Sequence, residues 1–218
     1  MQELQTIIDH INQVLEAKNA IRDQTLARSR ALIRYCANSI RATHRGDDGT
    51  AQELLNTARR AAADMISAAK QYPDIYYAGY TQDALKEMAE AHLTRAIILD
   101  EPLPSPEELN IEQAAYLNGL AEAAGELRRF ALDALRQGKV PRAEEILGAM
   151  DDIYSILITI DFPDAITGGL RRNSDMVRAV LERTRGDVTT AVRQEAMKAA
   201  LQAFEQRVGL SADEADGL

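Results

Sequence analysis

Apolar residues recur every three or four positions along most of this chain, which is the spacing of an amphipathic α-helix. No stretch alternates between apolar and polar residues convincingly enough to be a strand. The first helical run extends from about Leu4 to Arg45, and a helix of about forty residues is about 60 Å long. Because a helix of that length needs long partners to cover it, the pattern favours a bundle of helices.

Proline, glycine and aspartate residues divide the rest of the chain into further helices. Thr50 is expected to cap the second helix, with Glu53 completing a capping box, and Ser105 is expected to cap the fourth. Gly186 is expected to end the sixth helix, so that the seventh begins directly after it. We expect the helices after the first to span about residues 50–72, 74–99, 106–136, 141–162, 168–186 and 187–208.

The composition agrees with one helical domain. The chain has 218 residues, of which 46% are hydrophobic and 5% aromatic, so it can bury one substantial core. Its commonest residues are good helix formers. We therefore predict an all-α fold, a bundle of about seven helices in a single domain over residues 1–208, followed by an acidic and frayed tail over residues 209–218.

Charge and cysteine content restrict the function and the compartment. A net charge of −9 argues against a protein that coats nucleic acid with its whole surface, since phosphate binding rests on clustered Lys and Arg. A localised basic patch remains compatible with this charge. Cys36 is the single cysteine, and its apolar surroundings indicate a buried structural thiol. Without a disulfide, and without an apolar run of the ~18 residues that a membrane span needs, we expect a soluble cytoplasmic protein with no membrane partner.

Two pairs of glutamates stand at helical spacing: Glu87 with Glu90, and Glu122 with Glu126. Residues three or four apart lie on one face of a helix, so each pair presents two carboxylates in the same direction. Two such faces brought together would offer four oxygen-rich ligands, which suit Mg²⁺ or Mn²⁺. An amphipathic helix with solvated glutamates has the same pattern, and spacing alone favours that simpler interpretation.

Arginines gather in two parts of the sequence. One set stands at intervals of four, seven and four on a single stripe of the first helix: Arg30, Arg34, Arg41 and Arg45. A second cluster begins with Arg171 and Arg172. Guanidinium groups suit phosphate oxygens, so both sets are candidates for binding nucleic acid. Ion pairing with the chain's surplus carboxylates is an equally good interpretation.

Several segments in order resemble the translin and translin-associated factor X (Trax) superfamily, in particular its short prokaryotic members. The segments that carry the resemblance are residues 29–36, 40–47, 103–109, 116–122, 125–129, 162–165, 169–172 and 183–187. The resemblance implies an all-helical protomer that assembles into a hollow octamer and encloses nucleic acid. It further implies single-stranded RNA as the partner, with single-stranded DNA as a second candidate. In the Trax branch the RNA is cleaved by acidic residues with Mg²⁺, whereas translin mainly binds.

The acidic residues of the Trax branch match this sequence position by position. Its Glu-x-x-Glu-Ala motif corresponds to residues 87–91, and its second motif corresponds to residues 119–127. The resemblance thus implies metal ligands and catalytic groups at Glu87, Glu90, Glu122 and Glu126. Glu122 stands where the family usually has Asp, and an extra methylene shifts a metal by about 1 Å, which can cost ~10²-fold in rate.

Three hypotheses follow. The first is a Trax-like endoribonuclease, in which the arginines named above hold the RNA backbone independently of sequence. The second is a translin-like oligomer that binds single-stranded nucleic acid without cleaving it, which is favoured by Glu122 and the low pI. Translin's basic segment is absent at residues 76–82, which carry no positive charge. The third is an all-α nucleotide pyrophosphohydrolase of the MazG type, disfavoured by a poor match downstream.

Overall fold

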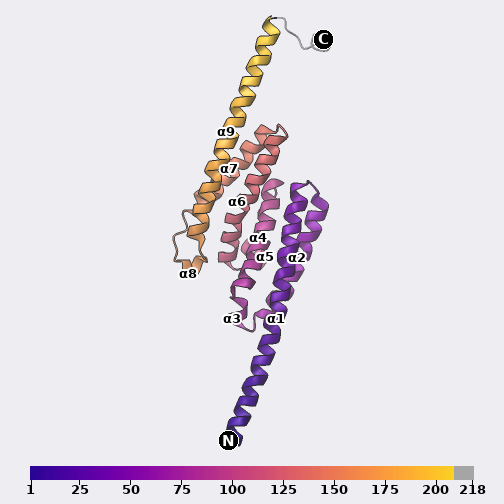
Figure 1. The fold of residues 1–218 in the computed structure, drawn as a ribbon, viewed down its shortest axis with the longest axis vertical. Coiled ribbons are helices and arrows are strands. Elements are labelled where there is room, and N and C mark those ends of the chain that lie inside the picture. The colour runs from indigo at the N-terminus through magenta and orange to yellow at the C-terminus, as the bar shows by residue number, and fades with distance from the viewer. Residues whose placement is uncertain (209–218) are drawn as a thin grey trace.

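Six long α-helices form the body of the protein over residues 1–208, the part of the chain that this computed structural model describes (Figure 1). They are α1 (Gln2–His44), α2 (Asp48–Ala69), α4 (Gly79–Ile98), α6 (Gln113–Arg136), α7 (Val140–Leu157) and α9 (Leu170–Val208). Three helices of four residues lie in the connections: α3 (Pro73–Tyr76), α5 (Pro106–Leu109) and α8 (Asp164–Thr167). The predicted all-α class is confirmed over these residues. The predicted acidic tail over residues 209–218 lies outside them.

Two apolar clusters hold the bundle together, one on each side of the contact between α4 and α6. The first lies among α1, α2 and α4 and includes the buried Leu32, Leu55 and Leu85. The second lies among α6, α7 and α9 and includes Met150 and Leu181. Burying one large aliphatic side chain contributes about 1.5–3 kcal/mol. The two clusters together therefore fix α4 against α6, which pack along each other in the middle of the protein.

The two longest helices extend beyond this body at opposite ends (Figure 1). Residues 1–17 of the chain are all exposed, and α2 covers the second half of α1 rather than the first. At the other end, residues 193–208 of α9 are exposed in the same way. The long partners that the first helix was expected to need are thus found within the chain only for the second half of α1.

The first turns of α2 and α5 show how the predicted caps turned out. Asp47 rather than Thr50 is the N-cap of α2, because its side chain accepts a hydrogen bond from the Thr50 backbone N–H at 3.2 Å. The expected Ser105 cap is confirmed, together with its capping box. The helix it opens ends at Leu109, however, since Asn110 takes a left-handed conformation with φ 54°. A second start, at α6, then replaces the continuous helix expected over residues 106–136.

The predicted helix over residues 74–99 is divided into α3 and α4. Ala78 has an extended backbone conformation and separates the two helices. Thr81, in the first turn of α4, donates its hydroxyl hydrogen to the Ile75 carbonyl oxygen at 2.8 Å, which fixes the corner between them. Tyr77 stands at this corner with 63% of its surface exposed.

The predicted break at Gly186 is wrong, because α9 continues through it. Arg128 of α6 donates to the Thr184 hydroxyl at 3.1 Å and forms an ion pair with Asp187 at 2.8 Å, so it contacts α9 on both sides of the glycine. Val188, one half-turn further on, is buried against the second apolar cluster. These contacts offset the ~1 kcal/mol that a glycine inside a helix costs relative to alanine.

Cys36 is fully buried among apolar side chains, as predicted for a structural thiol. Its burial raises the pKa of the thiol, and the nearby Glu87 and Glu90 raise it further. Among the described residues, no helix is long and apolar enough to span a bilayer.

Candidate metal centre between helices α4 and α6

Gly119 allows α6 to approach α4 unusually closely at the level of the glutamates. A Cβ atom at this position would lie 2.6 Å from the Lys86 carbonyl oxygen and 2.7 Å from the Ala89 Cβ. Real Cβ atoms essentially never show such distances, so any side chain here would push the two helices apart. The glycine therefore sets the separation across which acidic side chains of α4 and α6 can meet.

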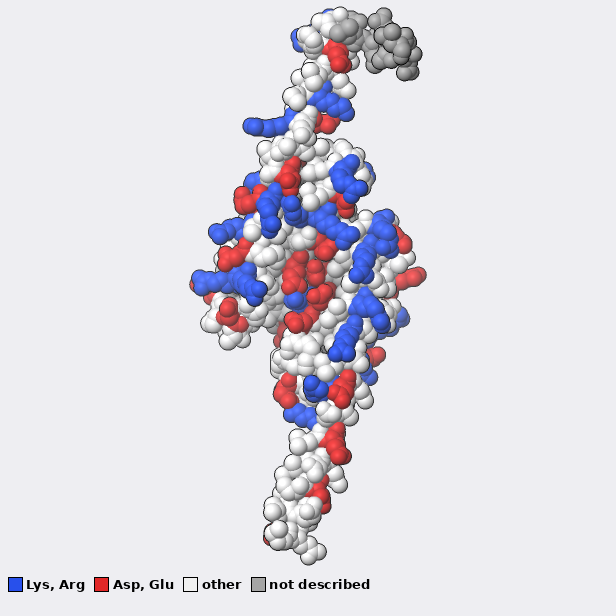
Figure 2. Space-filling view, viewed as in Figure 1, with Lys and Arg blue, Asp and Glu red and all other residues white. Residues whose placement is uncertain are grey.

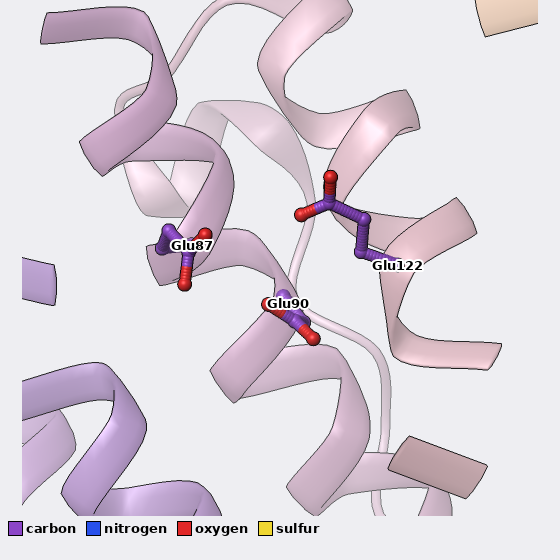
Figure 3. Close-up of side chains that lie close together, drawn as sticks. All are labelled: Glu87, Glu90 and Glu122. Atoms are coloured by element: carbon purple, nitrogen blue, oxygen red, sulfur yellow. The ribbon is translucent and has the colours of Figure 1, made fainter. Parts of the chain in front are cut away.

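Three of the four predicted glutamates come together across this contact. Glu87 and Glu90 project from α4, and Glu122 projects from α6 toward both of them (Figure 3). Each offers a carboxylate oxygen that lies within 4.8 Å of the oxygens offered by the other two. All three side chains are half-buried, so the carboxylates are only partly exposed to solvent.

Crowding and burial change the acidity of this cluster. Burial raises the pKa of Glu90 to about 8, and the negative charges of Glu87, Glu122 and Glu126 add to the effect. Burial likewise raises the pKa of Glu87, although Lys86 beside it acts in the opposite direction. Like charges in a poorly solvated place oppose ionisation, and a divalent cation among them would remove that repulsion. The donor set, three carboxylates and space for water, fits Mg²⁺ or Mn²⁺.

Lys86 is the cation that the structure places in this cluster. Its Nζ donates to Glu122 Oε1 at 2.7 Å and lies 4.0 Å from Glu87 Oε1. Burial by itself lowers the pKa of the ammonium group, but the hydrogen bond to Glu122 and the surrounding carboxylates outweigh burial and raise it. Lys86 therefore stays charged and holds Glu122 in place.

Glu126, the fourth predicted ligand, has a different partner. Its Oε2 lies 2.5 Å from His44 Nε2, at the end of α1, and 3.8 Å from Arg129 Nη1. The hydrogen bond to His44 lowers the pKa of Glu126, with smaller contributions from nearby arginines, one of which is Arg41. Glu126 is near enough to act electrostatically on Glu90 but is not part of the group of three.

The predicted nucleic-acid-binding arginines flank the acidic centre. Arg30, Arg34 and Arg41 are exposed along α1, and Arg45 is exposed at its C-cap. Figure 2 shows blue side chains along α1 on one side of a red patch in the middle of the molecule, and further blue side chains over α9 on the other. Arg171 and Arg172 are exposed in the first turn of α9.

The arrangement of these arginines bears on the alternative that they pair with carboxylates. Arginine ion pairs within 4.0 Å among the described residues involve other positions, such as Arg95, Arg128 and Arg185. Arg41 instead donates to the Asn38 side chain. All six predicted arginines thus keep their charge available to a ligand, as far as the described part of the chain is concerned.

Sequence analysis missed three residues that shape the centre. Lys86 directly precedes Glu87, and a lysine among acidic residues on a helix is usually a solvent-exposed charge, so the sequence did not single it out. His44 is 82 positions from its partner Glu126, a separation that no local pattern spans. Gly119 was recognised as part of a motif, but its role depends on the distance between two helices. A glycine in a helix that would otherwise favour alanine was the available signal.

No protein-family model matches the chain. It is 32% identical over 195 residues to the uncharacterized protein MJ0175 of Methanocaldococcus jannaschii, a match that covers 88% of this chain and 84% of that protein. The structure is similar to AfC3PO in a complex with duplex RNA, with a TM-score of 0.80 and 33% identity over 86% of this chain and 97% of that one. AfC3PO alone matches with a TM-score of 0.79. Apo-NeC3PO, at 22% identity and a TM-score of 0.78, shares the fold.

Proposed function

Because the chain belongs to the C3PO family of translin and Trax proteins, we propose that it is a metal-dependent endoribonuclease that binds and cleaves single-stranded RNA inside a hollow homo-oligomer, an octamer. Single-stranded DNA is a second candidate ligand. The observation that supports catalysis is the convergence of Glu87, Glu90 and Glu122 from two helices whose spacing Gly119 sets. Solvated glutamates on an ordinary amphipathic face do not require such a close approach.

Glu87, Glu90 and Glu122 would hold Mg²⁺ or Mn²⁺. The bound ion would activate water for attack on a phosphodiester and stabilise charge on the phosphate. Glu126 serves as a further ligand or as a base beside the cluster, oriented by His44. Lys86 holds Glu122 toward the other two carboxylates and offers a positive charge next to the place where the phosphate binds.

The positively charged arginines attract the phosphates of RNA, which the carboxylates of the acidic centre would repel. Arg30, Arg34, Arg41 and Arg45 line α1 beside the cluster, while Arg171 and Arg172 stand on α9. Contacts from guanidinium groups to phosphates position a strand without reading its sequence. The similarity to AfC3PO, which has been described in a complex with duplex RNA, supports RNA as the ligand class.

The decisive experiment incubates the purified protein with labelled single-stranded RNA in Mg²⁺, in Mn²⁺ and in EDTA. We expect cleavage with either metal, none in EDTA, and none with Glu87→Ala/Glu90→Ala. Glu144→Ala removes an exposed carboxylate from α7 and serves as the matched control, which should cleave like the wild type. Cleavage that persists in EDTA or in the double variant would refute the proposed site.

A translin-like binding oligomer without catalysis is the second candidate. The ion pair between Lys86 and Glu122 favours it, because an ammonium group already neutralises one of the three carboxylates. In that case RNA binding would survive in Glu87→Ala/Glu90→Ala and no condition would give cleavage. The same incubation therefore separates the two functions.

A further inference from the structure

A cavity of about 1220 Å³ opens beside the acidic cluster, among α4, α6, α8 and the first turns of α9. Glu122 and Lys86 line it, so the cavity and the cluster share a wall. Tyr77 stands at another side, and Arg172 belongs to the α9 wall. Ile166 and Met176 add apolar surface to the lining, which is therefore neither uniformly charged nor uniformly apolar.

Tyr77 presents an aromatic ring that the fold holds in position. The ring of Tyr76 meets it edge-on, with centroids 4.8 Å apart and planes at 78°. Tyr76 is itself buried and donates its hydroxyl hydrogen to Glu112 Oε1 at 2.9 Å. Although Tyr77 is 63% exposed, its ring thus contacts a buried ring whose hydroxyl is hydrogen-bonded to Glu112, the N-cap of α6. An exposed aromatic ring with such a contact is a platform on which a nucleobase can stack.

The wall that carries Arg172 is fixed as firmly. The next residue, Asn173, donates its side-chain amide to Asn118 Oδ1 at 2.8 Å. Asn118 is buried on α6 and donates in turn to the Thr167 carbonyl oxygen of α8 at 2.7 Å. The start of α9 is therefore tied to α6 and α8, while the Arg172 side chain itself remains exposed. A guanidinium on a rigid wall suits a phosphate at a defined place.

We propose that this cavity binds one unpaired nucleotide of the RNA strand, next to the phosphate held at the acidic cluster, with its base stacked on Tyr77 and its phosphate on Arg172. This inference rests on the proposed function and adds where the strand runs. A base inside a duplex is stacked and paired, so it can reach Tyr77 only when its strand is single. The cavity thus selects unpaired RNA at the cluster.

The absence of tryptophan from the sequence provides a direct test. Tyr77→Trp places a single tryptophan at the cavity, and a base that stacks on it quenches its fluorescence. Phe162→Trp is the matched control, since Phe162 is also 63% exposed but lies outside this cavity. The probe is single-stranded oligoadenylate in Mg²⁺, compared with the same strand annealed to oligouridylate. Anisotropy of the labelled strand reports binding, and gel electrophoresis of the same samples reports cleavage.

We expect oligoadenylate to quench Tyr77→Trp but not Phe162→Trp, and the duplex to quench neither. Adding Arg172→Ala to Tyr77→Trp should raise the midpoint of quenching about tenfold, and Tyr77→Ala should weaken binding of the labelled strand by a similar factor. Binding without quenching, equal quenching by the duplex, or no binding at all would overturn the inference. Quenching without cleavage would support the cavity while rejecting the nuclease. Cleavage without quenching would reject the cavity and leave the nuclease standing.

Discussion

The charge state of Glu90 depends on how closely other carboxylates surround it in a half-buried position. Its pKa of about 8 reflects burial first and the charges of Glu87, Glu122 and Glu126 second. Near neutral pH, the metal-free cluster therefore holds a proton that a bound cation would displace. The same property makes Glu90 a source of instability when it is ionised and no metal is present.

The pH dependence of stability tests this charge state. The pKa of Glu90 is higher in the folded protein than its ordinary value of 4.5, so the folded state binds more protons between those values and the free energy of unfolding falls as pH rises through them. In EDTA, Glu90→Gln should raise Tm at about pH 9 by about 2–4 °C, and the gain should nearly vanish at about pH 5. Differential scanning calorimetry measures Tm at both pH values. Glu195→Gln, an exposed carboxyl on α9, should change neither, and equal values of Tm for Glu90→Gln and wild type at high pH would contradict the expectation.

Glu122 stands at the position where the resemblance to the Trax branch implies Asp. In the structure its longer side chain reaches across from α6 to within 4.8 Å of the α4 glutamates. Glu122→Asp would withdraw the carboxylate by about 1 Å, so we expect weaker Mn²⁺ binding and a loss of cleavage of up to ~10²-fold. Calorimetric titration and single-turnover cleavage would measure the two effects. Glu126→Asp should have a smaller effect on Mn²⁺ binding, and faster cleavage by Glu122→Asp would show that the glutamate is misplaced.

Sequence spacing identified four glutamates but not which of them would meet. Glu87 and Glu90 belong together because both stand on one face of α4. Glu122 and Glu126 share a face of α6 in the same way, yet His44 draws the second toward the end of α1. That partner depends on where two distant helices cross, which residue spacing does not record. Residue spacing thus predicted which glutamates share a helix face, but not which of them meet across the two helices.

At the scale of helices, packing decided where local signals conflicted. Asp47 and Thr50 are both residue types that cap helices well, and the sequence does not say which of the two, three positions apart, begins the helix. Gly186 is a local signal for a break, but α9 buries residues on both sides of it and continues. Helix class and approximate length could be predicted because they follow from apolar spacing. Exact ends could not, since they depend on tertiary contacts.

Gly119 offers a test of how strictly the α4–α6 distance controls the centre. Gly119→Ala should lower the free energy of unfolding by about 1–3 kcal/mol, because the new methyl group overlaps the α4 backbone. It should also weaken Mn²⁺ binding by separating Glu122 from Glu87 and Glu90. Gly125→Ala, on the same helix with nothing within 4 Å, is the control and should stabilise by about 0.5–1 kcal/mol. Urea unfolding would measure the free energy of unfolding of both variants, and titration with Mn²⁺ would measure their affinity for the metal. If Gly119→Ala were as stable as the wild type and bound Mn²⁺ with the same affinity, the close contact between α4 and α6 would not control the geometry of the site.

At the scale of the whole molecule, the projecting ends of α1 and α9 carry apolar seams that nothing in the described chain covers. On α1, Leu4, Ile7, Ile11 and Val14 follow a spacing of three and four and are each 43–53% exposed. On α9, the same spacing joins Met197, Leu201, Phe204 and Val208, which are 50–62% exposed. Such spacing is typical of helices that pack against other helices. Apolar spacing alone does not tell a partner helix within the chain from one in another subunit, so the sequence could not show which of the two covers these α1 positions.

The α1 seam therefore tests the proposed oligomer and its link to RNA. Ile7→Glu/Ile11→Glu puts two charges on the seam, so we expect a smaller assembly by light scattering, with helix content unchanged because residues 1–17 are exposed in the single chain. Thr6→Glu/Gln13→Glu adds the same charge on the opposite face of α1 and should keep the wild-type mass. If RNA is cleaved inside a chamber, cleavage should fall together with the mass. A full-sized assembly in Ile7→Glu/Ile11→Glu would exclude the seam as an interface, and a small species that still cleaves RNA would show that one chain's cluster, arginines and cavity suffice.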